Sequence, residues 1–393
     1  MELLKRAKAL QTELTELRRR LHATAEVGFD VEKTQKIVTE TLKAYGYAPK
    51  ACGKGGVIAD VGKGKTQFLL RADVDALPIR EKTGLPFAAK NGNMHACGHD
   101  IHTAMLLGAA KLLKENETRL KGGVRLLFQP AEELLEGATD MIRNGAIPKT
   151  GAGVMLHVMT GVPLKTGTLV VSSAGVSAPA ADFFEVRVRG KACHGSAPQN
   201  GVDALSAAAH ILVALQEVSA REIPAGEGAV LTVGKMQAGN ADNAIADEAV
   251  FSGTLRAFSE ETRTLLKTRL QTVSKGVAKA FRAVASVRFK SGCPTLLNDG
   301  QVSKYAYETL RKTLGNEVVY SAEVGGGTAK KSGGSEDFAY ISQLLPSVML
   351  GVGAGNEKEG YEYPLHHPKA TFDERALPIG AYAFTALALG KIR

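Results

Sequence analysis

The chain has 393 residues, with 49 Lys and Arg against 40 Asp and Glu, so its formal net charge at pH 7 is +9. The basic residues are spread along the chain, aromatic residues are few and no nucleic-acid-binding motif is present, which argues against a nucleic-acid partner. No apolar run approaches the ~18 residues of a membrane span, and the widely spaced cysteines predict no disulfide framework. We therefore expect a cytoplasmic protein of two or three domains, with neither a nucleic-acid nor a membrane partner.

Helical and strand patterns alternate over the first part of the chain. Apolar residues at helical spacing predict helices over 3–23, 32–45 and 101–113. Short apolar runs predict strands over 67–73, 122–130 and 154–157. This alternation is typical of an α/β fold, in which a mixed, mainly parallel sheet is flanked by helices.

The pattern changes in the middle of the chain. Between residues 179 and 291 the predicted elements follow the order β-α-β-β-α-β, which matches a ferredoxin-like α+β unit. The α/β character then resumes and includes a Gly-rich loop over 325–337. We therefore expect one domain over 1–178 and 292–393, into which a second domain over 179–291 is inserted.

Metal-competent side chains gather at the ends of the predicted strands. Asp73 ends one strand, Glu132 and Glu133 follow the next, and His157 ends the third. Ligands of open parallel sheets lie outside the carboxyl ends of the strands. Adjacent glutamates are usually surface residues and a lone histidine usually packs in a core, so the prediction of a site depends on their conjunction. In such a site one glutamate binds metal while its neighbour acts as general base.

A six-residue segment, His95-Ala-Cys-Gly-His-Asp100, places two imidazoles, one thiol and one carboxylate at the start of a predicted helix. Cys, His and carboxylate ligands together suit Zn²⁺, Mn²⁺, Co²⁺ or Ni²⁺. We interpret Cys97 and His99 as metal ligands. We interpret His95 and Asp100 as residues that support these ligands or cap the helix.

Motifs along almost the whole chain resemble those of the amidohydrolase branch of the aminoacylase/carboxypeptidase metallopeptidase family. This branch includes hippurate hydrolases, N-acyl-L-amino-acid amidohydrolases and auxin–amino-acid hydrolases. The matching stretches are R-A-D-V-D-A-L-P (71–78), H-A-C-G-H-D-I-H-T-A-M-L-L-G-A-A (95–110), Q-P-A-E-E (129–133), L-H-V (156–158), C-H-G-S-A-P (193–198), G-T-L-R (253–256), G-S-E-D-F (334–338) and L-H-H-P (365–368).

The resemblance implies a zinc-exopeptidase-like catalytic domain that binds two divalent ions, with the inserted domain as a lid or dimerisation domain. The implied metal ligands are Cys97, His99, Glu133, His157 and His366, with Cys97 as a bridging ligand. Glu132 would be the general base acting on a metal-activated water. His194 would stabilise the oxyanion, and Asn243 and Arg256 would bind the substrate carboxylate.

The chain departs from the family pattern at several positions. Arg71 stands where many relatives have a histidine ligand, so Asp73 is expected to orient the site rather than to bind metal. The segments His22-Ala-Thr-Ala-Glu26 and Asn243-Ala-Ile-Ala-Asp247 lack the proline of the corresponding motifs. His367 lies next to His366 at a position where relatives often have Asn, so the motif alignment selects His366 as the ligand.

The resemblance implies cleavage of the amide bond of N-acyl-L-amino acids whose acyl group is acetyl, benzoyl or similar. A dipeptidase or carboxypeptidase of the same family is the alternative, and a non-catalytic protein that binds metal or a small ligand is a third. The expected assembly is a homodimer or homotetramer, in which His194 acts in its own subunit or in a partner's.

Overall fold

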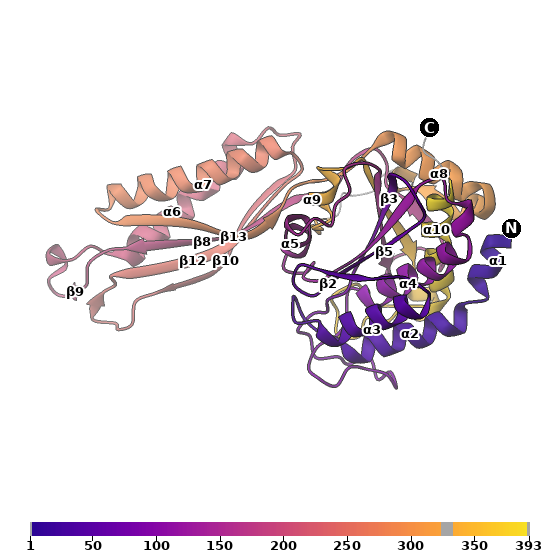
Figure 1. Cartoon of the computed structure of the whole chain (residues 1–393). Coiled ribbons are helices and arrows are strands. Elements are labelled where there is room, and N and C mark those ends of the chain that lie inside the picture. The colour runs from indigo at the N-terminus through magenta and orange to yellow at the C-terminus, as the bar shows by residue number, and fades with distance from the viewer. Residues whose placement is uncertain (1, 324–332, 391–393) are drawn as a thin grey trace. The chain divides into compact units, whose positions relative to one another are not determined.

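The computed structural model describes residues 2–323 and 333–390 (Figure 1), so residues 325–332 of the expected Gly-rich loop lie outside the described residues. The described residues form two compact units. The first comprises 2–177, 297–323 and 336–390, and the second comprises 178–296 together with 333–335. The continuous part of the second unit thus starts one residue before the expected insert, 179–291, and ends five residues after it.

An eight-stranded sheet is the centre of the first unit. Its strands are β1 (Lys50–Cys52), β2 (Gly56–Val61), β3 (Thr66–Asp73), β4 (Gly123–Gln129), β5 (Ala152–Met159), β6 (Leu169–Val171), β15 (Val318–Tyr320) and β16 (Ser347–Gly353). They lie in the order β1-β2-β4-β3-β5-β16-β6-β15. The four central strands, β4, β3, β5 and β16, run parallel to one another. β1 and β2 pair antiparallel with their neighbours, and β6 pairs antiparallel with β16 and parallel with β15. The predicted mixed, mainly parallel sheet is therefore confirmed.

Helices lie against both faces of this sheet (Figure 1). On one face the helices that share the main apolar core are α1 (Glu2–Lys8), α2 (Gln11–Thr24), α3 (Glu32–Ala44), α4 (His99–Glu115), α8 (Gly300–Leu314) and α10 (Leu377–Leu389). Two short helices, α5 (Gly137–Arg143) and α9 (Ala339–Ser342), pack on the other face. A strand covered on both faces is apolar almost throughout, as β5 is.

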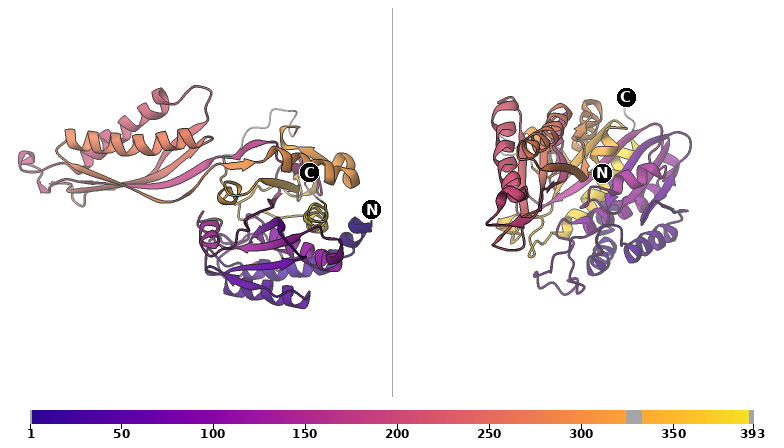
Figure 2. Two further views of the ribbon diagram at one scale, coloured as in Figure 1. Left: turned by 45° about the horizontal axis from the view of Figure 1, so that its top comes forward. Right: turned by 90° about the vertical axis from the view of Figure 1, so that its left-hand side faces the viewer.

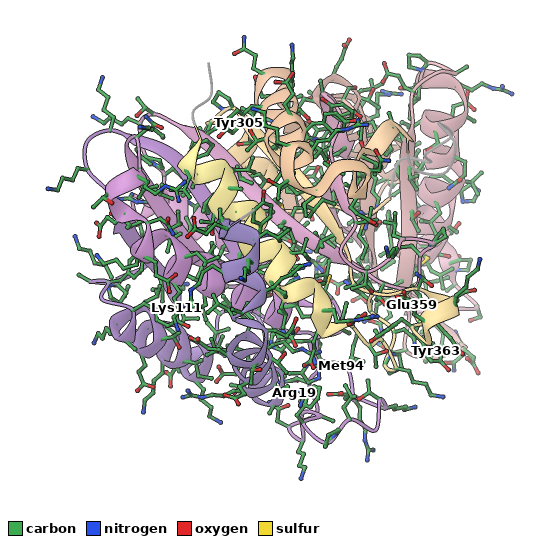
Figure 3. The ribbon with its side chains drawn as sticks, turned by 90° about the vertical axis from the view of Figure 1, so that its right-hand side faces the viewer. Arg19, Met94, Lys111, Tyr305, Glu359 and Tyr363 are labelled. Atoms are coloured by element: carbon green, nitrogen blue, oxygen red, sulfur yellow. The ribbon has the colours of Figure 1, made fainter. Side chains whose placement is uncertain are left out.

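Polar contacts also join the helices of the main core. Tyr305 on α8 donates its hydroxyl to the Leu387 carbonyl on α10 at 2.7 Å, and Lys111 on α4 bonds Glu13 on α2 at 2.6 Å (Tyr305 and Lys111 are labelled in Figure 3). The single helix expected over 3–23 is wrong. The chain turns between α1 and α2, where the Leu10 amide bonds the Ala7 carbonyl, and this turn buries the Leu10 side chain.

The second unit has the β-α-β-β-α-β order that the sequence predicts. Its main elements are β8 (Ala180–Arg189), α6 (Ala204–Glu217), β10 (Ala229–Ala238), β12 (Glu248–Ala257), α7 (Glu260–Ala280) and β13 (Val284–Cys293). The strands form an antiparallel sheet in the order β10-β12-β8-β13. Both helices cover one face of that sheet and enclose a separate apolar core (Figure 2). This ferredoxin-like α+β unit confirms the predicted fold class.

Among the described helices, none is both long enough and apolar enough to cross a bilayer.

Candidate metal centre

The predicted metal-competent side chains of the first unit lie at one edge of the eight-stranded sheet. Asp73 is the last residue of β3, Glu132 and Glu133 follow the end of β4, and His157 lies near the end of β5. Because these three strands are parallel and adjacent, their carboxyl ends meet at the same edge. The sequence therefore predicts the position of this cluster correctly.

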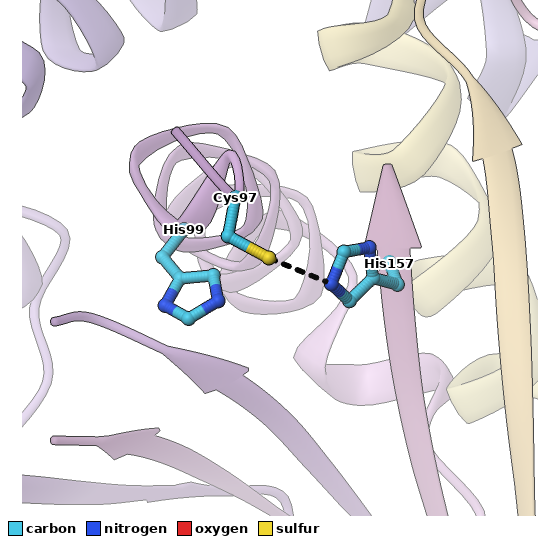
Figure 4. Close-up of side chains that lie close together, drawn as sticks. All are labelled: Cys97, His99 and His157. Atoms are coloured by element: carbon cyan, nitrogen blue, oxygen red, sulfur yellow. Dashed lines mark hydrogen bonds between the residues drawn. The ribbon is translucent and has the colours of Figure 1, made fainter. Parts of the chain in front are cut away.

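Cys97 and His99 enter the same cluster from the start of α4. Gly98 between them has φ +84°, and a Cβ at this position would lie 2.4 Å from Val158 Cγ2 on β5. A side chain is therefore excluded here, and the first turn of α4 approaches β5 closely. Cys97 Sγ then lies 3.5 Å from His157 Nε2 (Figure 4).

Donor atoms of the five predicted ligands approach one another in two overlapping groups. Cys97, His99 and His157 offer atoms that lie within 4.8 Å of one another, and so do Cys97, Glu133 and His366. Cys97 belongs to both groups, as a ligand shared between two ions must. The five side chains thus form one cluster around the thiol.

The orientation of the imidazoles also fits a metal centre. His99 Nδ1 bonds the Asp75 carbonyl at 2.9 Å, and His157 Nδ1 bonds the Val158 carbonyl at 2.8 Å. Metal-binding histidines are commonly fixed in this way, which leaves Nε2 for the metal. His99 Nε2 and Glu133 Oε1 are buried and have no hydrogen-bond partner among the described residues. Because an unpaired buried polar atom is costly, these atoms fit a cation.

Glu132 lies beside the cluster, with Oε2 3.9 Å from His99 Nε2. Burial, followed by the nearby Glu336 and Glu133 carboxylates, raises the pKa of Glu132 well above its ordinary value. A carboxylate of raised pKa is a better proton acceptor near neutral pH.

Of the two adjacent histidines in the loop after β16, His366 approaches the cluster. Its amide bonds the Ala96 carbonyl at 2.9 Å, its φ is +66°, and its Nε2 lies 3.4 Å from Glu133 Oε1. His367 instead stacks on Tyr363, with ring centroids 4.4 Å apart.

His102 is a site residue to which the sequence analysis assigns no role. Its Nδ1 donates to Asp73 Oδ1 at 2.6 Å, and its Nε2 accepts the Val158 amide at 2.8 Å. Burial lowers the pKa of His102 to about 4, so the ring is neutral, as this bonding pattern requires. The sequence signal that could have identified His102 is its spacing of three residues from His99, which places both rings on one face of α4.

Arg71 supplies a buried positive charge where many relatives are expected to have a histidine ligand. Its guanidinium donates to Asp73 at 2.6 Å and Asp337 at 2.8 Å, and lies 2.9 Å from Glu336. It also donates to Gln129 at 3.1 Å. The predicted orienting residue Asp73 is thus held between Arg71 and His102.

The interpretation of Asp100 as a helix cap is wrong, because Gly98 occupies the N-cap position of α4. Asp100 is instead buried and accepts from Arg18 Nε at 2.7 Å and from His22 Nδ1 at 2.8 Å. Asp100 therefore connects α4 to α2 through these two hydrogen bonds. Arg19, the next residue after Arg18, pairs with Glu374 at 2.7 Å (Arg19 is labelled in Figure 3).

His194, the predicted oxyanion-stabilising residue, and Asn243, a predicted substrate-binding residue, are neighbours in the second unit. His194 ends β9 (Cys193–His194) and Asn243 precedes β11 (Ala244–Ile245), which pairs with β9. Gly195 donates its amide to the Asn243 carbonyl at 2.7 Å. His194 Nδ1 accepts the Ser196 amide at 3.2 Å. The ring proton therefore lies on Nε2, and His194 can donate a hydrogen bond from that atom.

Arg256, the other predicted substrate-binding residue, lies on β12 of the same unit. Its Nη1 donates to the Gly333 carbonyl at 2.6 Å and to Ser335 Oγ at 2.9 Å. Both contacts use one nitrogen of the guanidinium.

Comparison with known proteins places this arrangement in context. Residues 69–390 match the family described as Peptidase family M20/M25/M40. The chain is 38% identical to N-acetyl-L-cysteine deacetylase of Bacillus subtilis, covering 95% of this chain and 86% of that protein. It is 34% identical to thermostable carboxypeptidase 1 of Saccharolobus solfataricus, covering 96% and 94%. The crystal structure of the Bacillus subtilis YXEP protein, described as a dinuclear metal binding peptidase, is similar with a TM-score of 0.79 and 33% identity, covering 97% and 98%.

Proposed function

Since the chain belongs to peptidase family M20/M25/M40 and is a metal-dependent amidohydrolase, we propose that it cleaves the amide bond of N-acyl-L-amino acids. The observation that carries this proposal is the position of Glu132 beside the cluster of Cys97, His99, Glu133, His157 and His366. The acyl group would be acetyl, benzoyl or similar, and the relative that deacetylates N-acetyl-L-cysteine supports this class.

The cluster would hold two divalent ions, with Cys97 shared between them. Cys97, His99, Glu133, His157 and His366 would be the protein ligands, and the mixture of sulfur, nitrogen and oxygen donors suits Zn²⁺, Mn²⁺, Co²⁺ or Ni²⁺. When bound, the ions would polarise the amide carbonyl and lower the pKa of the attacking water.

Glu132 would act first as the general base and then as the general acid of the reaction. It would take a proton from water as the water oxygen attacks the amide carbon, and deliver a proton to the amide nitrogen as the C–N bond breaks. The products would be a carboxylic acid and a free amino acid. The position of Glu132, with Oε2 3.9 Å from His99 Nε2, supports this role.

Side chains of the second unit would bind the remainder of the substrate. His194 would donate from Nε2 to the developing oxyanion, which is consistent with the occupation of its Nδ1 by Ser196. Asn243 and Arg256 would bind the substrate carboxylate. We propose the insert over 179–291 as a lid or dimerisation domain in a homodimer or homotetramer, with His194 acting in its own chain or in a partner's.

A dipeptidase or carboxypeptidase is a second candidate, because a carboxypeptidase is among the relatives with 34% identity. The deciding experiment loads the metal-free protein separately with Zn²⁺, Mn²⁺, Co²⁺ or Ni²⁺, counts the bound metal and measures hydrolysis of N-acetyl-amino acids, N-benzoyl-amino acids and dipeptides. We expect about two ions per chain and the highest kcat/KM on an acyl-amino acid. A preference for dipeptides would overturn the proposed substrate class.

The matched control for this experiment is Glu132→Gln. It removes the proton acceptor and keeps the size and the hydrogen-bonding capacity of the side chain. We expect this variant to bind as much metal as the wild type and to lose nearly all turnover. Substantial turnover by Glu132→Gln would contradict the role of Glu132.

A further inference from the structure

The turn that carries Glu132 and Glu133 has an unusual backbone. Ala131 and Leu135, which flank it, have φ values of +55° and +57°. Residues other than glycine adopt this left-handed conformation at a cost in free energy, so the surrounding contacts must hold it in place. Within the turn the Leu135 amide bonds the Glu132 carbonyl at 2.8 Å, and the Glu132 and Glu133 amides are bonded by a residue that follows β3.

Asp75, two residues after the end of β3, makes the contacts that fix the turn. Its Oδ1 accepts the Glu132 amide at 3.1 Å, and its Oδ2 accepts the Glu133 amide at 3.2 Å. The Asp75 side chain is fully buried. One carboxylate thus bonds two successive amides, which sets both the position and the direction of the turn.

The same residue also contacts the imidazole of His99. His99 Nδ1 bonds the backbone carbonyl of Asp75 at 2.9 Å and lies 3.3 Å from Asp75 Oδ1. Asp75 is therefore in contact with the backbone of Glu132, the backbone of Glu133 and the ring of His99. In the proposed function these are the general base and two of the metal ligands.

From these contacts we propose that Asp75 is a positioning residue, which sets the separation between the base Glu132 and the ligands Glu133 and His99. The proposal rests on the proposed function, because it takes the roles of those three residues from it. Asp75 acts through the backbone of its neighbours. This positioning role gives the buried Asp75 carboxylate a part in catalysis that the residue pattern alone does not assign.

The test replaces Asp75 by Asn, which keeps the size of the side chain. The Asn oxygen accepts one of the two amides, but its NH₂ group faces the other amide, donor against donor. Residues that orient metal ligands usually contribute about 10- to 100-fold to metal affinity or activity. We therefore expect Asp75→Asn to lower kcat by about 10- to 100-fold with KM within about threefold of the wild type, and to lower the affinity for metal about tenfold.

The matched control is Asp140→Asn on α5. Asp140 Oδ2 also accepts a backbone amide, that of Lys54, at 2.7 Å, but α5 carries none of the proposed site residues. Both variants remove a carboxylate–amide bond, so a purely structural role for Asp75 predicts that both lower the thermal midpoint and leave kcat and metal affinity unchanged. Wild-type kcat and metal affinity in a folded Asp75→Asn protein would overturn the proposal.

A readout without metal or substrate uses hydrogen exchange, resolved to single residues by mass spectrometry with electron-transfer fragmentation. In the metal-free wild type we expect the amides of Glu132 and Glu133 to be protected, although they lie outside any helix or strand. Rapid exchange of both would overturn the proposal even if Asp75→Asn does not fold. If the wild type hydrolyses no substrate of the panel, the proposed function fails, while exchange and metal affinity still decide the role of Asp75.

Discussion

His102 connects Asp73 to the backbone beside His157: its Nδ1 donates to Asp73 Oδ1 at 2.6 Å, and its Nε2 accepts the Val158 amide at 2.8 Å. The end of β3 and the end of β5 are thereby joined through one neutral imidazole on α4. The two hydrogen bonds of His102 can be tested separately by substitution. The amide nitrogen of Asn lies where Nδ1 of histidine lies, and the amide oxygen of Gln lies where Nε2 lies.

We predict that His102→Asn weakens metal binding more than His102→Gln does. The Asn variant keeps the bond to Asp73 and loses the bond that holds Val158 next to His157. The Gln variant does the opposite. The expected loss in metal affinity for His102→Asn is about 10- to 100-fold, measured by equilibrium dialysis against a graded chelator. Wild-type affinity in both variants would show that His102 does not support the metal centre.

Arg71 is predicted to stabilise the fold by balancing buried carboxylates. Replacement by Met removes the charge and leaves Asp73 and Asp337 buried without their guanidinium partner. Removing one partner of a buried ion pair commonly costs about 3–5 kcal/mol. We expect this loss in urea unfolding of the metal-free protein, followed by circular dichroism.

The control for Arg71→Met is Arg6→Met. Arg6 pairs with Glu115 at 2.6 Å, but both side chains are substantially exposed to solvent. Exposed pairs contribute about 0–1 kcal/mol. Similar losses of unfolding free energy in the two variants would contradict the prediction that burial makes the Arg71 ion pairs more important for stability.

The buried contacts of His22 on α2 with Asp100 and Glu81 predict that the stability of the protein depends on pH. Burial lowers the pKa of His22, but the Asp100 and Glu81 carboxylates outweigh it and hold the pKa above its ordinary value of 6.5. A group whose pKa is raised by folding stabilises the protein fully below its unfolded pKa, and this contribution is lost as pH rises through the folded pKa. His22→Gln should therefore cost more stability at pH 6 than at pH 9. Urea midpoints of the wild type and variant at both pH values measure the difference, and an equal cost would contradict the charged state of His22.

The sequence predicts the parts of the site that depend on strand direction and on short motifs. Asp73, Glu132, Glu133 and His157 follow from the rule that parallel strands bring their carboxyl ends to one edge. Cys97 and His99 follow from a motif at the start of a helix, and family resemblance selects His366 in place of His367. None of these assignments requires knowledge of a side-chain contact.

The remaining site residues depend on contacts between segments that are far apart in the chain. Arg71 contacts Asp337 across 266 residues, and Asp75 contacts Glu132 across 57. No periodicity encodes such pairs, because each is set by the packing of a strand end against a separate loop. The antiparallel strands β1 and β2 were also not predicted. β1 is an edge strand of only three residues, which is too short to carry a periodic pattern, and β2 lies between β1 and β4.

The position of Cys97 in two groups of donor atoms predicts how the metal content responds to its replacement. Cys97→Ser removes the thiolate, and we expect it to retain fewer than two ions per chain and to lose more than about 100-fold in turnover, beyond the usual effect of residues that only orient ligands. Cys97→Asp supplies a carboxylate that can also bridge two ions, so it should recover the second ion.

Cobalt loading distinguishes these variants spectroscopically. The wild type with Co²⁺ should show thiolate-to-metal charge-transfer absorption in the near ultraviolet, and both Cys97 variants should lack it. The control is Cys193→Ser, because the Cys193 thiol lies in the second unit and donates to the Ala197 carbonyl at 3.4 Å. That variant should keep both the absorption and the two ions. If the absorption persists in Cys97→Ser, the thiol that binds cobalt is another one, and Cys97 cannot be the ligand around which the other four donors are arranged.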